Sequence, residues 1–291
     1  MRKIPISNNN NYRIISVVIT HNPPHSIYKL IAQLASTYKI IIIDSSTPTN
    51  FNLMKDKLQY TNIILEHENV HYGLGNALNL AIKISKKFEY DFLLIMEDDS
   101  FFVDNVDIIA IIDKFKKCYK DKDALYLSKN QYRSEDYFIE IKGYSSTNSG
   151  IILSKDLMLK IEFRAEFFMD QIDVDFQWNI KQLGGKLIQT KYKIIERLPI
   201  GRENKHGINT ISIFRFYLLT RNTIILFMEQ KIKIKQLLYI PGYFLRLLIS
   251  GQKVHYLFIA LFNGIVDALK HNLGITKTLK LFRPDLDSAN L

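Results

Sequence analysis

The sequence predicts an α/β protein with a mostly parallel, twisted sheet, helices on both sides of it, and a helical appendage at the C-terminal end. Two observations predict this class. In the first half of the chain, short β-rich runs alternate with segments of helical periodicity. These β-rich runs are apolar almost without interruption, which is typical of parallel strands that are buried on both faces.

The individual elements follow from these patterns. Strands are expected at 13–20, 39–44, 61–66 and 91–97, with helices over "HSIYKLIAQLAS" and 73–88. After Ser100 the alternation loosens. There we expect a helix over about 104–118, strands in "ALYLS", "YFIEIKGY" and 149–155, and a helix over 173–185 that Gly184 and Gly185 stop.

The chain divides into three expected parts. The polar, aperiodic run "SNNNN" predicts a flexible leader over 1–12. The main domain is expected at 13–230, and a basic, apolar, helical tail at 231–291.

Charge and cysteine content limit the functional classes. Cys118 is the one cysteine, which excludes an internal disulfide framework and a cysteine zinc site. The formal net charge of +10 favours an anionic partner. In the tail, basic residues alternate with two apolar runs that are shorter than the ~20 residues of a membrane span. The tail could therefore lie on an anionic membrane surface without crossing it.

Polar residues follow three of the expected strands. His21 and Asn22 come after the first, Asp44 after the second, and "EDD" (97–99) after the fourth. Ligands of open parallel sheets bind beyond the carboxyl ends of the strands, so this edge is the expected site. Nucleic acid would explain the charge but not these carboxylates, and it is not an expected partner.

The carboxylate triplet is the strongest local signal. In an extended segment Glu97 and Asp99 lie on one side and Asp98 on the other. Mg²⁺ or Mn²⁺ commonly takes one or two carboxylates together with substrate phosphates, while a solvated acidic turn is the alternative. Asp44 is either a turn former or an acceptor for a ribose hydroxyl or a base N–H.

Two further segments have open interpretations. Asp170, Asp173 and Asp175 precede or begin a helix, where they are either caps or include a general base. Gly73 and Gly75 lack the third glycine and the order of a dinucleotide fingerprint. A helix that begins at these glycines would still suit a nearby phosphate or sugar.

Seven motifs in order resemble family 2 glycosyltransferases of the GT-A fold, the nucleotide-diphospho-sugar transferase fold. They are "VVITHNP", "IIIDSST", "NVHYGLGNALNLAI", "LLIMEDDS", "NSGIILS", "FMDQIDVDFQWNIKQLGG" and "RFYLLTRN", between residues 13 and 225. Within the family, the chain is similar to rhamnosyltransferase-like and galactofuranosyltransferase-like members.

The resemblance implies roles for particular residues. Asp173 matches the catalytic base. The expected nucleotide-sugar contacts are Thr20, His21, Asn22, Asp44, Asn69, Gly73, Asn79, Glu97 and Asp98. Asp98 and Asp99 match the metal motif, with Asp99 as the direct ligand of Mg²⁺ or Mn²⁺. Acceptor or diphosphate contacts are implied for Asp175, Arg215, Arg221 and Asn222.

Three positions depart from the family pattern. Glu97 stands where many relatives have Asp, and Asn179 where Arg is frequent. Leu198 stands at the position of the metal-site histidine, for which His206 is the nearest substitute.

The resemblance implies an inverting glycosyltransferase that moves a sugar from a nucleoside-diphosphate sugar to a hydroxyl of a glycan or lipid-linked saccharide. It is expected in the cytoplasm, where it could lie on the inner face of the cell membrane. Two alternatives stay open: a sugar-nucleotide nucleotidyltransferase, and a non-catalytic protein that binds a membrane surface. The first lacks its usual glycine- and lysine-rich loop, because "THNPPHS" contains no glycine.

Overall fold

The computed structural model describes residues 12–58, 60–68, 73–104, 106–144, 149–198 and 211–283. The chain forms two compact units. The first comprises 1–69, 77–162 and 179–198, and the second comprises 70–76, 163–178 and 199–291. The division expected near residue 230 therefore falls inside the second unit. The expected leader, apart from Tyr12, lies outside the described residues.

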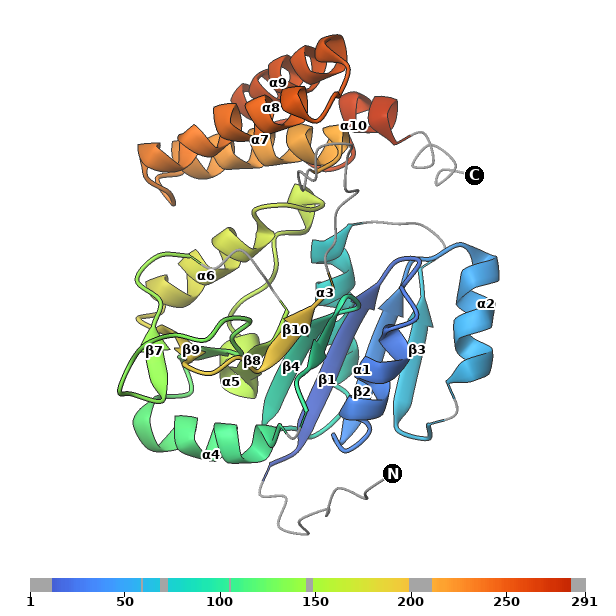
Figure 1. Ribbon diagram of the computed structural model, residues 1–291, viewed down its shortest axis with the longest axis vertical. Helices are drawn as coiled ribbons and strands as arrows, with labels where there is room; N and C mark the ends of the chain where they lie inside the picture. The colour runs from blue at the N-terminus through green and yellow to red at the C-terminus, as the bar shows by residue number, and fades with distance from the viewer. Residues whose placement is uncertain are drawn as a thin grey trace. The chain divides into compact units, whose positions relative to one another are not determined.

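The first unit is built on a sheet with the strand order β3-β2-β1-β4-β8-β6-β9-β7 (Figure 1). Its strands are β1 (Ile14–Thr20), β2 (Lys39–Asp44), β3 (Ile63–His67), β4 (Phe92–Glu97), β6 (Ala124–Tyr126), β7 (Phe138–Glu140), β8 (Ile151–Ser154) and β9 (Leu187–Thr190). The pairs among β3, β2, β1 and β4 are parallel, as predicted. Beyond β4 the sheet is mixed, because β8 is antiparallel to both β4 and β6.

A separate two-stranded ribbon joins β5 (Ser100–Phe102) to β10 (Ile195–Arg197). The two strands are antiparallel, and Arg197 pairs with Ser100. The ribbon therefore brings residue 197 next to the carboxylates that follow β4.

Helices complete the first unit: α1 (Ile27–Leu34), α2 (Pro48–Lys57), α4 (Ile108–Cys118) and α5 (Lys155–Met158). Helix α2 was not among the expected elements. Pro48 occupies the first helical position, where its missing N–H costs nothing. Met54 is the one buried residue of α2, so an apolar periodicity that would predict a helix is absent.

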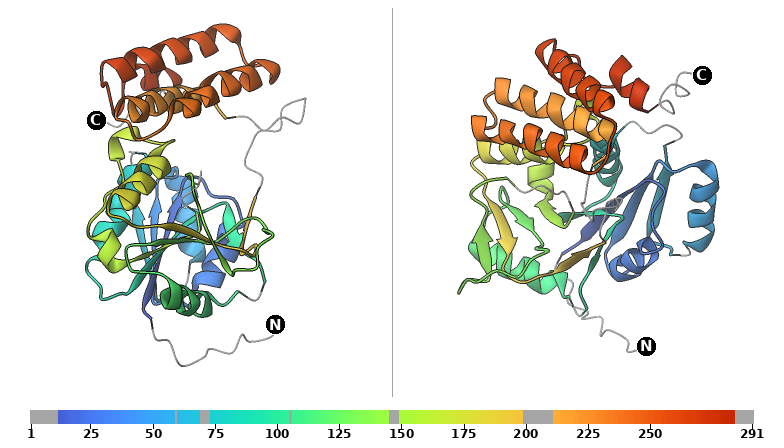
Figure 2. Two further views of the ribbon diagram at one scale, coloured as in Figure 1. Left: turned by 90° about the vertical axis from the view of Figure 1, so that its left-hand side faces the viewer. Right: turned by 45° about the horizontal axis from the view of Figure 1, so that its top comes forward.

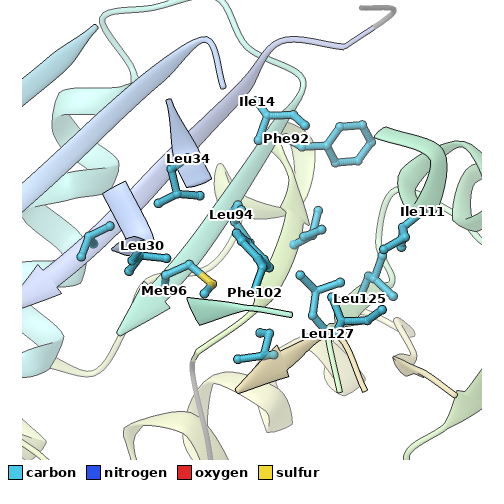
Figure 3. Packing of buried hydrophobic residues seen from close by; sticks show 14 of the residues in the cluster. Ile14, Leu30, Leu34, Phe92, Leu94, Met96, Phe102, Ile111, Leu125 and Leu127 are labelled. Carbon is cyan, nitrogen blue, oxygen red and sulfur yellow. The ribbon is translucent and has the colours of Figure 1, made fainter. Parts of the chain in front are cut away.

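The core of the first unit lies between the sheet and the helices α1 and α4. One hydrophobic cluster includes Leu30 and Leu34 of α1, Ile111 of α4, and Leu94 and Met96 of β4 (Figure 3). The strand residues that point to the opposite face, among them Ile15, Val17, Ile41, Ile43, Leu93 and Ile95, are equally buried. Both faces are covered, as continuous apolar strands require.

The second unit is mainly helical in its described residues, and it includes the expected tail. It contains η1 (Ala165–Phe167), α7 (Ile213–Met228), η2 (Ile234–Leu238), α8 (Tyr239–Ile249), α9 (Val254–Leu269) and α10 (Lys277–Phe282). Phe216, Tyr217, Leu247, Leu257 and Leu279 belong to its core. Two helices, α3 (Leu74–Ser85) and α6 (Ile172–Gln182), begin in this unit and end in the first.

Candidate functional site

The carboxyl ends of β1, β2 and β4 meet at one edge of the sheet. In the strand register Thr20 lies opposite Asp44, and Ile19 lies opposite Glu97. The polar residues that follow the three strands are therefore neighbours, as the sequence predicted. This edge is the candidate donor site of the first unit.

Asp98 turns toward the end of β1. Its Oδ2 accepts a hydrogen bond from Oγ1 of Thr20 at 3.0 Å and one from the backbone N–H of His21 at 3.3 Å. Burial raises the pKa of Asp98 to about 6, although these two hydrogen bonds oppose the shift. Asp98 therefore fixes the loop that begins at His21.

Glu97 and Asp99 face a guanidinium group on the other side of the chain. Arg197 Nε lies 2.6 Å from Asp99 Oδ2, and Arg197 Nη2 lies 2.7 Å from Glu97 Oε2. Oγ of Ser100 donates to the second oxygen of Asp99 at 2.9 Å, and Asp99 is buried. As expected, Glu97 and Asp99 lie on one side of the segment and Asp98 on the other, and Arg197 bridges Glu97 and Asp99.

The contacts of the three carboxylates decide whether a divalent cation fits among them. Among the described residues, no three His, Cys, Asp or Glu side chains form a group that could hold a metal ion. Arg197 already supplies the positive charge between Glu97 and Asp99, and Asp98 accepts from Thr20 and His21. The described side chains, as arranged, do not fit Mg²⁺ or Mn²⁺. His206 lies outside the described residues.

Asp44 is fully buried and organises the neighbouring loops. Its carboxylate accepts from the backbone N–H of Ser46 at 3.0 Å and from Oγ of Ser46 at 2.6 Å, and Nδ1 of His67 lies 3.1 Å away. His67 in turn stacks on Phe51, with ring centroids 4.1 Å apart. These contacts favour the turn-former interpretation of Asp44, and a contact with a nucleotide base stays a prediction.

His21 and Asn22 are exposed at this edge. Nδ1 of His21 lies 2.7 Å from the carbonyl oxygen of Ser45. Asn22 adopts a left-handed conformation, with φ of 51°, and its backbone N–H donates to Oγ of Ser46 at 2.6 Å. Asp44 thus positions the exposed loop through Ser46, while the loop itself presents the polar groups.

In the second unit, the segment before α6 has an unusual backbone. Phe168, Asp170 and Gln171 all have positive φ, of 64°, 48° and 68°. Such conformations cost about 1–3 kcal/mol each unless the surroundings fix them. Gly73 lies against this segment, because a Cβ added at Gly73 would lie 2.4 Å from the carbonyl oxygen of Phe168.

Arg221 and Asn222 provide that fixation. Nδ2 of Asn222 lies 3.0, 2.9 and 2.8 Å from the carbonyl oxygens of Phe167, Met169 and Asp170. Arg221 donates to the carbonyl oxygens of Glu166 and Phe167, each at 3.3 Å. Both side chains are fully buried. As placed, they hold the backbone that leads into α6. The expected contact of these two residues with the diphosphate or the acceptor stays a prediction.

The other acidic and basic residues of this segment have different surroundings. Asp173 is half-buried in the first turn of α6, where the helix dipole favours a carboxylate. Asp175 is buried and pairs with Lys231 at 2.7 Å, and its expected contact with the acceptor or the diphosphate stays a prediction. Arg215 makes two bonds to Asp170, at 3.1 and 2.5 Å, and stays partly exposed.

The remaining predicted residues are placed as follows. Asn79 lies half-buried in α3, and Asn69 is outside the described residues. Asn179, the frequent arginine position, lies in α6. Leu198 lies next to the triplet, because its backbone N–H donates to the carbonyl oxygen of Asp99 at 2.8 Å.

Two residues of the site were missed from the sequence. His67 ends β3, as Asp44 ends β2, and the two are register partners. Its position directly after the strand expected at 61–66 was the available signal. Arg197 directly precedes Leu198, the position where the family resemblance implies a metal-site histidine. Leu198 departs from the family pattern, and the basic residue next to it was the available signal that an arginine supplies positive charge at this site.

Comparisons with known proteins agree with this architecture. Residues 16–146 match the family model described as glycosyl transferase family 2. No curated protein matches the sequence. Among solved structures, the fold is similar to that of S. aureus TarS 1–349, with a TM-score of 0.54 and 15% identity over 89% of this chain and 82% of that chain. It is also similar to a longer S. aureus TarS structure, with a TM-score of 0.51 and 15% identity over 93% of this chain and 50% of the other.

The matched segment contains β1, β2, β3 and β4 and the polar edge at which β1, β2 and β4 end. The shared fold extends over most of the chain. The chain has the GT-A fold, and its segment 16–146 is similar to glycosyl transferase family 2.

Proposed function

We propose that this protein transfers a sugar from a nucleoside-diphosphate sugar to a hydroxyl group of a glycan or lipid-linked saccharide. The observation that carries the proposal is the joining of two strand ends, those of β1 and β4, through Asp98, Thr20 and His21, inside the segment that matches the family. Open parallel sheets bind ligands at such an edge. The subtype proposed from the sequence resemblance is rhamnosyl or galactofuranosyl transfer.

The donor is proposed to bind at the loop after β1. His21 and Asn22 are exposed there, and Asp44 and Asp98 hold their backbone through Ser46 and Thr20. A preorganised loop loses little conformational freedom when a ligand binds, which favours affinity. Glu97, Asn69, Gly73 and Asn79 remain proposed members of the donor site.

Asp173 is proposed as the general base. Its carboxylate takes the proton of the acceptor hydroxyl while the hydroxyl oxygen forms a bond to the anomeric carbon. The bond from that carbon to the diphosphate oxygen breaks in the same step, so the configuration inverts. A positioned base is worth about 10²–10⁴-fold in rate. The buried pair Arg221 and Asn222 supports this assignment, because it fixes the segment directly before α6.

The family resemblance implies Mg²⁺ or Mn²⁺, which when bound would offset charge on the departing diphosphate. With Arg197 in its present position the described residues do not fit such an ion. The metal and the participation of His206 stay predictions, and no step above depends on them. Arg215 stays the proposed diphosphate or acceptor contact among the basic residues.

The site of action is proposed to be the cytoplasmic face of a membrane. None of the helices in the described ranges is both long enough and apolar enough to cross a bilayer. A lipid-linked acceptor is proposed to be reached from the membrane surface. The basic, apolar tail is the part of the chain that suits binding to this surface.

The donor is tested first by thermal stabilisation. A series of nucleoside diphosphates is added with and without Mn²⁺, and a bound ligand raises the apparent melting temperature by mass action. Stabilisation by one nucleotide is the expected result. If no nucleotide stabilises the protein under either condition, the proposed function fails and the non-catalytic alternative replaces it.

The base is tested by substitution. Asp173→Asn should abolish release of nucleoside diphosphate in the presence of acceptor and leave nucleotide stabilisation unchanged. The matched control is Asp156→Asn, an exposed Asp in the first turn of α5. Transfer at the wild-type rate by Asp173→Asn would refute the base. Release of pyrophosphate, in place of nucleoside diphosphate, would indicate the nucleotidyltransferase.

A further inference from the structure

Helices α8 and α9 are apolar on the side that packs inward and also on part of the side that faces solvent. In α9, Phe258, Phe262 and Leu269 are each more than half exposed, and Ile265 lies on the same side. They recur at intervals of four, three and four residues, which defines one stripe of a helix. On the inward side of α9, Leu257, Ala260 and Ala268 are buried.

Helix α8 and the preceding η2 have a similar outward stripe. Ile234, Leu238, Leu245 and Ile249 are all more than half exposed, while Ile240 and Leu247 face the core. A surface helix ordinarily has polar residues opposite its buried stripe. These helices depart from that rule, and a group of large exposed apolar residues marks an interaction surface.

The two stripes belong to neighbouring helices. Helices α8 and α9 contact each other and both contact α7 (Figures 1 and 2). The rings of Phe244 in α8 and Phe258 in α9 meet edge to face, with centroids 5.3 Å apart. Because Phe258 is itself exposed, the apolar surface continues from one helix to the other.

The charge of this region is one-sided. Exposed basic residues accompany the stripes at Lys233, Lys235, Arg246, Lys253 and Lys270. Between residues 231 and 283 the sequence has one acidic residue, Asp267. Asp267 is buried and accepts hydrogen bonds from Tyr217 at 2.7 Å and Asn272 at 2.9 Å. The described surface of the stretch is therefore apolar and cationic.

We propose that the outer surface of η2, α8 and α9 docks on a lipid bilayer that contains anionic headgroups. The apolar side chains enter the boundary between headgroups and acyl chains, and the flanking Lys and Arg side chains bind the headgroups. Tyr239 and Tyr256 near the two helix starts are exposed and suit the same interfacial depth. A second copy of the chain fits less well, because two cationic surfaces repel each other.

The experiment uses the full chain and vesicles, without any sugar nucleotide. Binding is measured by co-sedimentation with vesicles of phosphatidylcholine alone and of phosphatidylcholine with phosphatidylglycerol. We expect strong binding only to the anionic vesicles, and weaker binding as salt increases. Phe262→Ser should reduce partition by about tenfold or more. Lys253→Gln should reduce it by roughly fivefold, since each basic residue near an anionic surface is worth ~1 kcal/mol.

The matched control is Leu53→Ser, a more than half exposed leucine in α2 of the first unit, which should bind as the wild type does. Phe262→Ser leaves the Phe244–Phe258 contact in place, and its melting temperature reports whether the fold is kept. Equal binding by Phe262→Ser and the wild type would overturn the proposal. So would light scattering that shows a dimer dependent on Phe262, together with no vesicle binding.

This test is independent of the proposed chemistry. Nucleotide stabilisation of Phe262→Ser should equal that of the wild type, because Phe262 has no role in the donor site. A protein that binds anionic vesicles but no nucleotide would leave the docking surface standing and refute the glycosyl transfer. A protein that binds nucleotide but no vesicles would refute the docking surface and leave the glycosyl transfer standing.

Discussion

The Nε of Arg197 lies 2.6 Å from Oδ2 of Asp99, at the position where the family resemblance implies a bound cation. A backbone hydrogen bond also joins the two segments, because the N–H of Leu198, which follows Arg197, donates to the carbonyl oxygen of Asp99 at 2.8 Å. Arg197 is 34% exposed, whereas Asp99 is almost completely buried. A cation that approached Asp99 would therefore compete with Arg197.

Removing Arg197 should expose this competition. Arg197→Gln removes the guanidinium that bridges Glu97 and Asp99, so its melting temperature should fall. Added Mn²⁺ should then raise the melting temperature more than it does in the wild type, by mass action. We expect Mn²⁺ to bind about tenfold more tightly, which corresponds to ~1.4 kcal/mol. The measurement is thermal denaturation and calorimetry across a Mn²⁺ series.

The control for that experiment is Arg133→Gln, which removes the same charge from an exposed loop position. It should behave as the wild type does toward Mn²⁺. Weaker or unchanged Mn²⁺ binding by Arg197→Gln would show that the two cations do not compete for Asp99.

Asn222 should matter for stability and for turnover, and not for nucleotide binding. Asn222→Ala leaves the carbonyl oxygens of Met169 and Asp170 without their side-chain donor, while that of Phe167 keeps Arg221. Losing such buried hydrogen bonds costs roughly 1–3 kcal/mol per unsatisfied group. Denaturant unfolding should show a loss of several kcal/mol in total, and any folded fraction should bind nucleotide normally but transfer sugar slowly.

Thr223→Val is the adjacent control. Thr223 is equally buried, and its hydroxyl finds no partner among the described residues. Replacing an unsatisfied buried hydroxyl with a methyl group of similar shape is neutral or stabilising. A large loss from Thr223→Val would mean that burial in α7, and not the contacts of Asn222, determines these effects.

Gly73 should not accept a side chain. Its φ is +92°, and an added Cβ would lie 2.4 Å from the carbonyl oxygen of Phe168. Gly73→Ala is therefore expected to destabilise the protein by ~2 kcal/mol or more, which is measurable in urea. Gly143→Ala is the matched control, because a Cβ added at Gly143 would meet nothing within 4 Å. Equal stability of the two variants would contradict the close approach.

Glu68 should make stability depend on pH near neutrality. Burial, with the charge of Glu66 nearby, raises the pKa of Glu68 from 4.5 to about 7. The folded state thus favours the protonated form. Its contribution to stability is complete below about pH 4.5 and is lost as the pH rises through about 7.

The expected observation is a melting temperature that falls between about pH 5 and pH 8, with a smaller fall in Glu68→Gln. Glu89→Gln, on an exposed side chain that pairs with Lys155, is the control and should keep the wild-type slope. Parallel curves for the wild type and Glu68→Gln would exclude Glu68 as the titrating group.

The parts of the fold that local pattern determines were predictable. Strands β1, β2 and β4 are continuous apolar runs, and their carboxyl ends delivered Thr20, Asp44 and Glu97 to one edge as expected. Helix α2 was not predictable, because its register lacks an apolar stripe and buries one residue, Met54.

The side-chain partners within the site depend on distant residues. Arg197 and Asp99 are 98 positions apart and meet only because β10 pairs with β5. Asn222 reaches carbonyl oxygens 52 to 55 positions away, so its burial could not be read from the helical spacing of "RFYLLTRN". Spacing placed Arg215 and Asn222 on one helix, but tertiary contacts decided which of them faces solvent.

The chain passes between its two units more than once, with 70–76 and 163–178 inserted in the sequence of the first unit. Cutting the polypeptide at one point therefore cannot separate the units into whole pieces. A fragment that ended at residue 198 would keep Phe168 and lose Phe216 and Leu257, which share its hydrophobic cluster. A shortened form would thus lose part of this cluster, so the tests above use the chain with its C-terminal helices attached.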